Sequence, residues 1–152
     1  MFSNPHIKFL HKTNVQIRFN DVDIAGHVNN AMYFQYLDYA RLQYFKQVFQ
    51  DTIEWRKKGF VLVKIDIEYL ASIFLEDNIS VKTKINKIGN KSIEMQQQII
   101  KDSDGKEILT SNCISVLVGY DYQMKSSSTI PEQWKNKILE FEKNVIIKSA
   151  ME

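Results

Sequence analysis

A long segment in the first third of the chain, from Ala31 to Phe49, is apolar around most of its helical circumference. Its residues follow the i, i+3, i+4 and i+7 spacing of a buried helix, as in Tyr33, Tyr36, Leu37 and Ala40. A helix apolar on nearly every side is normally enclosed by other structure or inserted in a membrane. Charged residues interrupt this run, whereas a membrane span needs about 18 to 20 apolar residues. The pattern therefore predicts a long helix in the core of a soluble domain.

Alternation of apolar and polar residues with a period of two predicts strands elsewhere in the chain. A short strand is expected from Val15 to Phe19, before the helix. Four more are expected after it, at about residues 61–70, 79–85, 93–99 and 107–120. Turn-forming pairs, Asp77-Asn78 and Gly89-Asn90, and the run Asp102 to Gly105 separate these four strands. Strands joined by turns this short must be mostly antiparallel.

The alternation is one-sided, so the predicted sheet needs cover on one face, and only the long helix is large enough to provide it. The predicted fold is therefore α+β, a curved antiparallel sheet wrapped around one long central helix. The length of 152 residues suits a single domain over residues 1–152, with a core at about 13–122. Pro131 can begin a C-terminal helix at about 131–145, because it lacks the N–H that would be unsatisfied there. Residues 1–12 are expected to be a loosely ordered lead-in, with His6 and His11 at the surface.

Composition narrows the function classes. The net charge of +2 is too small to imply nucleic acid as the main partner. Cys113 is the only cysteine, so no intrachain disulfide can form and nothing points to secretion. We recognise no signal peptide and expect the cytoplasm as the location. Cys113 has no histidine nearby in sequence, so we do not expect it to act as a nucleophile.

The candidate chemistry lies in the polar turn before the helix, DVDIAGHVNN from Asp21 to Asn30. Asp23 can be a catalytic carboxylate or a loop aspartate that bonds its own backbone, and Asp21 is interpreted as a structural turn residue. His27 can orient a substrate, act as an acid or base near neutral pH, or make a structural hydrogen bond. It has no His or Cys partner at ligand spacing, so no metal is expected. Asn29 or Asn30 can cap the helix N-terminus.

The stretch RFNDVDIAGHVNNAMYFQYLDYAR, from Arg18 to Arg41, resembles the hotdog-fold acyl-CoA thioesterases. It is most similar to the 4-hydroxybenzoyl-CoA thioesterase type and its YbgC- and FadM-like relatives. That group carries a D-x-D-x-x-G-x-V segment before an aromatic-rich helix with Y-x-x-Y/F-x-[DE]-x-A-R spacing. The matching residues here are Asp21, Asp23, Gly26, Val28, Tyr33, Tyr36, Asp38, Ala40 and Arg41. The resemblance covers about residues 13–122.

The resemblance implies an acyl-CoA thioesterase, a hydrolase that converts an acyl thioester to a free acid and coenzyme A. In that group the aspartate three residues before the glycine, here Asp23, is the nucleophile or the general base. A backbone N–H at the start of the helix, here that of Asn30, polarises the thioester carbonyl. A helix N-terminus suits this role because it offers free N–H groups and a partial positive charge. His27 is a further catalytic candidate, and the expected substrate-binding residues are Gly26, Val28, Asn29 and Tyr33.

Other roles follow from position. Gly26 would let the loop pass close to the ligand. Asp38 and Arg41 are three residues apart and are expected to pair on the helix surface. Met32, Phe34, Tyr36 and Trp55 favour an apolar acyl group, of a length and an aromatic or aliphatic character that the sequence does not specify. The coenzyme A phosphates require basic residues, for which the candidates are Lys57, Lys58, Lys64, Lys82 and Lys84.

The resemblance also implies partners. No cofactor is expected, because coenzyme A is part of the substrate, and neither nucleic acid nor membrane is expected as a partner. In the family the active site lies at a subunit interface, so we expect a homodimer or a dimer of dimers.

Three alternatives stay open. Plant acyl-ACP thioesterases share the HVNN at His27 to Asn30, but they carry an asparagine where this chain has Ala25. A hotdog dehydratase or hydratase pairs a histidine with an acidic residue on the helix, and here Asp38 lies roughly 16 Å along the helix from His27. A non-catalytic protein that binds acyl thioesters would keep the pocket without hydrolysis.

Overall fold

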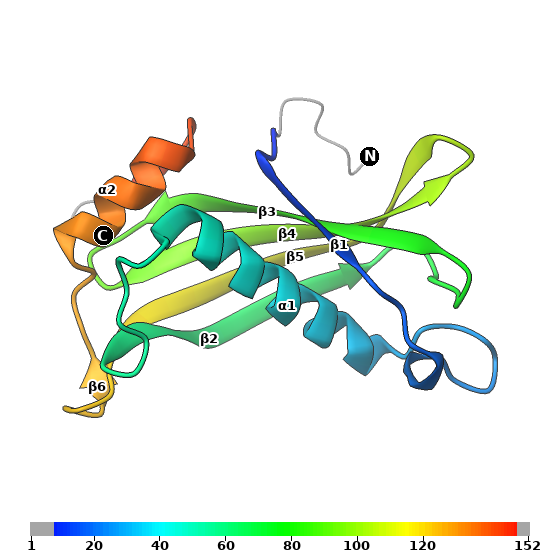
Figure 1. Ribbon diagram of the computed structural model, residues 1–152, viewed down its shortest axis with the longest axis horizontal. Helices are drawn as coiled ribbons and strands as arrows, with labels where there is room; N and C mark the ends of the chain where they lie inside the picture. The colour runs from blue at the N-terminus through cyan, green and yellow to red at the C-terminus, as the bar shows by residue number, and fades with distance from the viewer. Residues whose placement is uncertain (1–7, 149–152) are drawn as a thin grey trace. The chain divides into compact units, whose positions relative to one another are not determined.

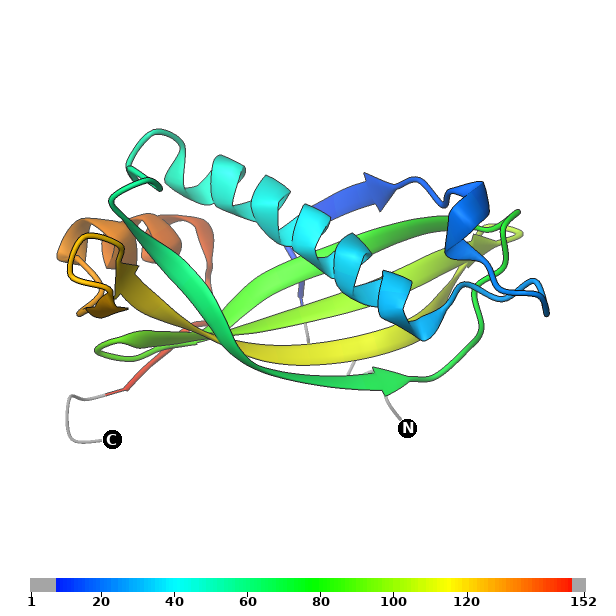
Figure 2. The same cartoon turned by 90° about the horizontal axis from the view of Figure 1, so that it is seen from below.

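The computed structural model describes residues 8–148, and Figure 1 shows their helices and strands. In chain order these are β1 (His11–Val15), the 3-10 helix η1 (Phe19–Asp21), α1 (Asn30–Phe49), β2 (Lys58–Tyr69), β3 (Asn78–Ile88), β4 (Ser92–Ser103), β5 (Lys106–Asp121), β6 (Ser126–Ser127), α2 (Glu132–Phe141) and β7 (Ile146–Ile147). The sheet has the strand order β1-β3-β4-β5-β2, with β6 beside β5 and β7 beside β3. α1 packs against this antiparallel sheet (Figure 2), which confirms the predicted α+β fold. The short β7 departs from the pattern, because it pairs with β3 in parallel.

Tight turns hold the sheet in register. The β3–β4 turn closes where the Gly89 N–H donates to the Ser92 carbonyl at 2.7 Å. In the β4–β5 turn, Asp104 and Gly105 both have positive φ, 54° and 80°. Positive φ at both central residues is the hairpin geometry that matches the twist of the flanking strands. The turns predicted from Gly89-Asn90 and from Asp102 to Gly105 are therefore confirmed.

The N-terminal strand lies earlier in the chain than predicted. β1 ends at Val15, the residue where the predicted strand begins, and it pairs antiparallel with β3. The Asp21 carboxylate accepts a hydrogen bond from the Arg18 N–H at 2.9 Å, so the chain turns into η1 instead of extending. Phe19 is consequently 77% exposed rather than half-buried in a strand.

His11, which we predicted at the surface, is buried in β1. Its Nε2 lies 2.7 Å from the Thr13 hydroxyl, and its backbone is paired opposite Thr83, which is fully buried. The prediction was wrong because a polar residue at the start of a short strand leaves no alternation to mark it. His6 lies outside the described residues.

Residue contacts divide the chain into two units, and α1 and the strands β2 to β5 each contribute to both. Of the described residues, the first unit contains 8–43, 67–83 and 97–113, and the second contains 44–66, 84–96 and 114–148. In the first unit the Gln97 side-chain amide of β4 donates to the Leu37 carbonyl of α1 at 3.0 Å. The single-domain assignment stays a prediction. No helix within residues 8–148 is long and apolar enough to cross a membrane.

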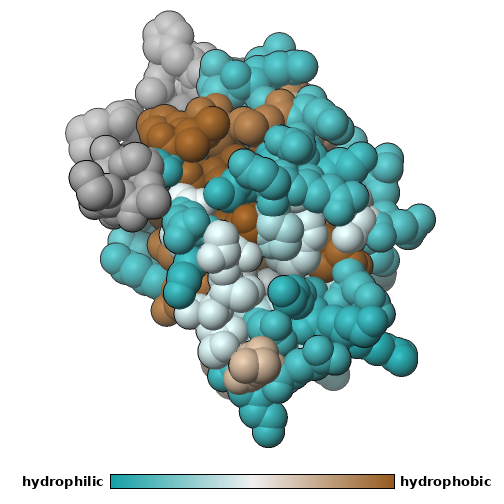
Figure 3. Space-filling view, turned by 90° about the vertical axis from the view of Figure 1, so that its left-hand side faces the viewer, coloured by the Kyte–Doolittle hydropathy of each residue, from teal (hydrophilic) through white to brown (hydrophobic). Residues whose placement is uncertain are grey.

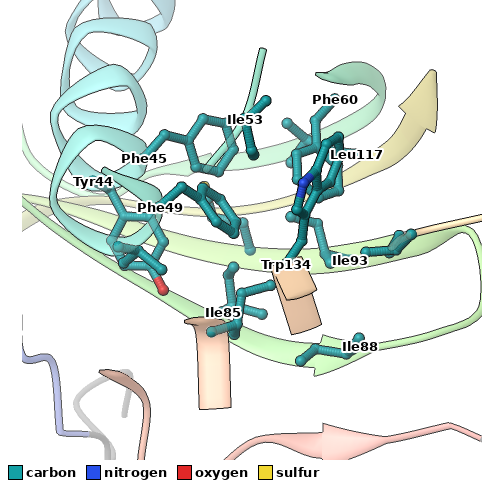
Figure 4. Close-up of a cluster of buried hydrophobic side chains, with 14 residues drawn as sticks. Tyr44, Phe45, Phe49, Ile53, Phe60, Ile85, Ile88, Ile93, Leu117 and Trp134 are labelled. Carbon is teal, nitrogen blue, oxygen red and sulfur yellow. The ribbon is translucent and has the colours of Figure 1, made fainter. Parts of the chain in front are cut away.

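The second unit contains a cluster of buried hydrophobic side chains (Figure 4). Phe45 and Phe49 of α1 stack near Phe60 of β2, with ring centroids 5.7 and 5.9 Å away. Trp134 of α2 meets the same ring at 5.3 Å. Complete burial of one such side chain contributes about 1.5–3 kcal/mol, so the cluster holds α1, β2 and α2 together within this unit.

The C-terminal helix is shorter than predicted. Pro131 is its N-cap rather than its first residue, and the helix runs from Glu132 to Phe141. The following residues lead into β7, whose Ile146 and Ile147 are exposed. Figure 3 views the side of the molecule that carries α2 and β6, where hydrophilic side chains predominate and hydrophobic ones gather in a patch.

Candidate active site

The polar turn before α1 is built around the side chain of Asp23. Its Oδ1 accepts hydrogen bonds from the backbone N–H groups of Ala25 at 2.9 Å and His27 at 3.2 Å. The Asp23 N–H donates to the His27 carbonyl at 2.8 Å, which closes the turn. Oδ2 has no hydrogen-bond partner within residues 8–148, and the residue is exposed. One carboxylate oxygen therefore shapes the loop while the other stays available.

The start of α1 leaves a backbone donor free. Asn29 is the N-cap: its Oδ1 accepts the Ala31 N–H at 2.9 Å, and its carbonyl accepts the Met32 N–H at 2.8 Å. Of the two asparagines proposed as caps, Asn29 is thus the one that acts. The Asn30 N–H has no acceptor in the described part of the chain. This N–H lies at the positive end of a helix dipole.

Asp21 is buried and stabilises the loop through hydrogen bonds, which confirms its interpretation as a structural residue. Its carboxylate is 1% exposed and accepts the Tyr36 hydroxyl at 2.7 Å and the Arg18 N–H at 2.9 Å, while the Arg18 Nη2 lies 3.1 Å away. Burial alone would raise the pKa of this carboxyl, but the hydrogen bonds and the Arg18 charge outweigh it and hold the pKa below its ordinary value. Burial and the bond to Asp21 raise the pKa of Tyr36.

Replacing Tyr36 by phenylalanine is expected to lower the free energy of unfolding at pH 7 by about 2 kcal/mol, the range for a hydrogen bond to a charged group. Because the pKa of Asp21 is lowered on folding, its contribution is complete above the unfolded pKa of about 3.9 and is lost as pH falls through the folded pKa. The penalty of Tyr36→Phe should therefore shrink below about pH 4. Urea unfolding at pH 7 and at pH 3 measures both quantities.

Tyr39→Phe is the matched control, because Tyr39 lies on the same helix, is 49% exposed, and its hydroxyl has no hydrogen bond in the described residues. It should unfold like the wild type at both pH values. An equal loss of stability in the two variants would contradict the role given to the Asp21–Tyr36 bond.

A cavity of about 210 Å³ lies at the start of α1. Four of the residues predicted for the site line it, namely His27, Val28, Asn30 and Tyr33. Its other lining residues come from the end of β2 and the following loop, namely Tyr69, Leu70, Ala71 and Ser72. The remaining predicted site residues, Asp23, Gly26 and Asn29, do not line it and instead form the adjoining turn. The structure thus joins a hollow lined by both polar and apolar side chains to a turn that carries a carboxylate.

Two tyrosines form one side of this cavity. The Tyr33 and Tyr69 rings meet edge to face with centroids 4.9 Å apart, and the Tyr69 hydroxyl donates to the Asn30 carbonyl at 3.3 Å. Burial, together with the neighbouring Tyr69, raises the pKa of Tyr33, and burial and nearby Cys113 raise the pKa of Tyr69. Both hydroxyls therefore remain protonated hydrogen-bond donors at neutral pH.

Gly26 occupies a backbone conformation with φ of +82°, and an added Cβ would meet no atom within 4 Å. Gly26→Ala is therefore expected to reduce the free energy of unfolding by about 1 kcal/mol through backbone strain alone. Gly105 provides the matched control, since its φ is +80° with equally open space, in the β4–β5 turn. Denaturant unfolding should give similar losses in the free energy of unfolding for both variants. Because only Gly26 is predicted to face the ligand, only Gly26→Ala should slow thiol release from acyl-CoA. Unchanged stability in either variant would contradict the strain.

The sequence missed the four cavity residues of β2 and its loop. They lie about 40 residues from the start of α1, and nothing in their pattern links them to that turn. Tyr69 alone carried a signal, because it ends a strongly alternating strand with an aromatic ring. A larger hollow of about 650 Å³, lined mostly by polar residues such as Lys12, Asn78 and Glu107, contains none of the predicted site residues.

The charged residues considered for the site differ in whether they form ion pairs. Three of the five lysines suggested for the coenzyme A phosphates pair with carboxylates: Lys57 with Glu54 at 3.2 Å, Lys58 with Asp121 at 3.8 Å and Lys82 with Glu107 at 2.7 Å. Lys84 is buried, whereas Lys64 is exposed and has no ion pair among residues 8–148. The predicted Asp38–Arg41 pair is confirmed at 2.7 Å, although Arg41 is buried rather than at the helix surface. The described residues contain no group of three or more His, Cys, Asp or Glu side chains that could hold a metal ion.

Comparison with known proteins agrees with the resemblance. Residues 17–138 match the family model of the thioesterase-like superfamily. The chain is 23% identical over 130 residues to the long-chain acyl-CoA thioesterase FadM of Escherichia coli, covering 84% of this chain and 96% of that protein. It is 24% identical over 92 residues to the acyl-CoA thioesterase YbgC of Haemophilus influenzae, covering 59% and 68%. Among solved structures, a Thermus thermophilus thioesterase complexed with coenzyme A and Zn is 28% identical, with a TM-score of 0.75 over 88% of this chain and 95% of that one.

Proposed function

Because this chain belongs to the thioesterase-like superfamily, with its hotdog fold, we propose that it hydrolyses an acyl-CoA thioester to a free acid and coenzyme A. The prediction of a thioester hydrolase is confirmed at the level of the family. What carries the proposal to this chain is the Asn30 N–H at the helix start, which has no acceptor among residues 8–148. It lies beside a turn in which one Asp23 carboxylate oxygen also has no hydrogen-bond partner among those residues.

In the proposed reaction the Asn30 N–H donates to the thioester carbonyl oxygen. This bond strengthens as negative charge develops on that oxygen, so it stabilises the transition state more than the substrate. The helix dipole adds to the same effect. The Tyr69 hydroxyl, bonded to the Asn30 carbonyl, supports the first turn of the helix.

Asp23 acts in one of two ways. As a nucleophile, its carboxylate oxygen bonds to the carbonyl carbon and the C–S bond breaks, releasing the coenzyme A thiolate. Water then hydrolyses the resulting anhydride and restores the carboxylate. As a general base, Asp23 instead takes a proton from the water that attacks the carbonyl carbon and passes it to the sulfur as the C–S bond breaks, so coenzyme A leaves as the thiol. Both routes consume one water and need no cofactor beyond the coenzyme A of the substrate.

The test is release of free thiol from short, medium, long and aromatic acyl-CoA substrates. We expect hydrolysis of at least one of these acyl classes. The outcome also decides the preference within the proposal, since the E. coli relative is a long-chain enzyme and the cavity of one chain is only about 210 Å³. If no acyl-CoA releases free thiol but an acyl thioester of an acyl carrier protein does, the plant-type acyl-ACP thioesterase alternative would be favoured. Binding of acyl-CoA without any release would favour a non-catalytic binding protein.

A homodimer, or a dimer of dimers, is part of the proposal. β2 is the last strand in the sheet order, and its Leu62 and Val63 are 42% and 57% exposed. An exposed apolar edge strand readily pairs with another chain. Light scattering on the purified protein should give a mass of at least two chains, and a monomer at enzyme concentrations that support activity would contradict the shared site.

A further inference from the structure

Lys101 of β4 holds one loop at three points. Its side chain is only 14% exposed, and its Nζ donates to the Ser72 carbonyl at 2.8 Å and to the Asp77 carboxylate at 3.2 Å. The same atom lies 5.3 Å from the centre of the Phe74 ring, within range of a cation–π interaction. All three partners belong to the loop of residues 70–77 between β2 and β3. One largely buried ammonium group therefore fixes the middle and the end of this loop.

The loop in turn contacts the candidate active site at consecutive positions. Its first residues, including Ser72, form a wall of the cavity. The Ile73 carbonyl accepts the Val28 N–H at 2.8 Å. Phe74 forms an antiparallel bridge with His27, and the two rings meet edge to face with centroids 4.8 Å apart and planes at 88°. Each of these contacts joins the loop to the turn that precedes α1.

We propose that Lys101 is a positioning residue: by holding Ser72, Phe74 and Asp77, it sets the cavity wall and the His27 ring against the start of α1. Its catalytic consequence rests on the proposed function, whereas the positioning itself does not. The Lys101 Nζ contacts Ser72, Asp77 and Phe74 and none of the groups to which the proposed reaction assigns a chemical role. The effect comes through geometry, since a displacement of about 1 Å in catalytic groups can cost about a hundredfold in rate.

The first test compares Lys101→Met, which keeps the stem and removes the charge, with Lys101→Arg, which keeps the charge. For the best acyl-CoA substrate, Lys101→Met should lower kcat by about tenfold or more with KM changed less than about threefold, and Lys101→Arg should stay within about threefold of the wild type. Lys106→Met is the control, because Lys106 begins the neighbouring strand β5, is exposed and has no ion pair in the described residues. A wild-type kcat in Lys101→Met would overturn the catalytic consequence.

The second test reads the geometry without activity. His27 is one of three histidines, so its ring proton signals can be assigned by NMR with a His27→Gln variant. Lys101→Met should move these signals, because the Phe74 ring beside them loses its support, and Lys106→Met should not. Phe74→Leu removes the ring itself at a 43% exposed position and should move them even if Lys101→Met folds poorly.

The two failures are distinguishable. His27 signals that stay unmoved in Lys101→Met, while they move in Phe74→Leu, would overturn the positioning by Lys101. Absence of thiol release by the wild type would overturn the proposed function instead.

Discussion

Asp23→Asn is expected to lower kcat for acyl-CoA hydrolysis by about a hundredfold or more, near 2.7 kcal/mol of barrier. An asparagine Oδ1 can still accept the N–H groups of Ala25 and His27, so the loop should keep its shape. The variant loses the negative charge that a nucleophile or a general base requires. A loss of activity in a loop that remains intact would therefore report chemistry rather than misfolding.

The measurement is thiol release under saturating substrate, with unfolding by urea as a check on stability. Asp102→Asn is the matched control, because Asp102, near the end of β4 in the first unit, is also exposed and accepts a backbone N–H, that of Gly105 in the following turn, at 3.0 Å. It should retain wild-type activity. Full activity in Asp23→Asn would move the catalytic role elsewhere, and His27 would be tested next.

A single turnover in water labelled with oxygen-18 tests the nucleophilic role of Asp23. Hydrolysis of an anhydride by attack on the aspartyl carbon would leave the label in the protein, which the general-base route cannot do. Attack of water on the acyl carbon, of either the thioester or the anhydride, places the label only in the acid product.

Asn30→Pro is expected to lower kcat by about a hundredfold to a thousandfold, the cost of losing one oxyanion donor in a well-studied enzyme. Proline removes the backbone N–H, and the first helical position is where a helix best tolerates it. The N-cap Asn29 before it normally has the extended backbone that a residue preceding proline prefers. The helix should therefore survive while its free donor disappears.

Asn30→Ala completes this experiment, because it removes the side chain and keeps the N–H. It should hydrolyse acyl-CoA within a few-fold of the wild type, and circular dichroism should show equal helix content in both variants. Wild-type activity in both Asn30→Pro and Asn30→Ala would refute the donor role. An equal loss of activity in both variants would also refute it and would assign the effect to the side chain.

The long helix and the hairpins were predictable because their signals are local. The apolar spacing from Ala31 onward and the turn residues at Gly89 and Gly105 each act within a few positions. The resemblance to the family motif identified the candidate turn. The N-cap also followed from local chemistry, although the choice of Asn29 over Asn30 needed the structure.

The predictions that failed depend on side-chain hydrogen bonds to the backbone or on contacts distant in sequence. The buried carboxylate of Asp21 turns the chain at Phe19, and no alternation pattern carries that information. The cavity wall at Tyr69 to Ser72 reaches the turn only when the sheet forms. The same is true of the bond by which Lys101 holds the loop of that wall. Hydrophobic periodicity and secondary-structure propensity describe one segment at a time, so they could not predict which distant segments form this site.

Under the proposed function the two oxygens of Asp23 have separate roles, one in the turn and one in the reaction, and this affects how related sequences should be interpreted. A copy that lost hydrolysis would still need an acceptor for the Ala25 and His27 N–H groups, so selection for folding alone would retain aspartate or asparagine there. Presence of the aspartate in a related sequence is therefore weak evidence for activity. Asparagine at that position is the informative substitution, because it can keep the turn while removing the charge that the proposed reaction requires.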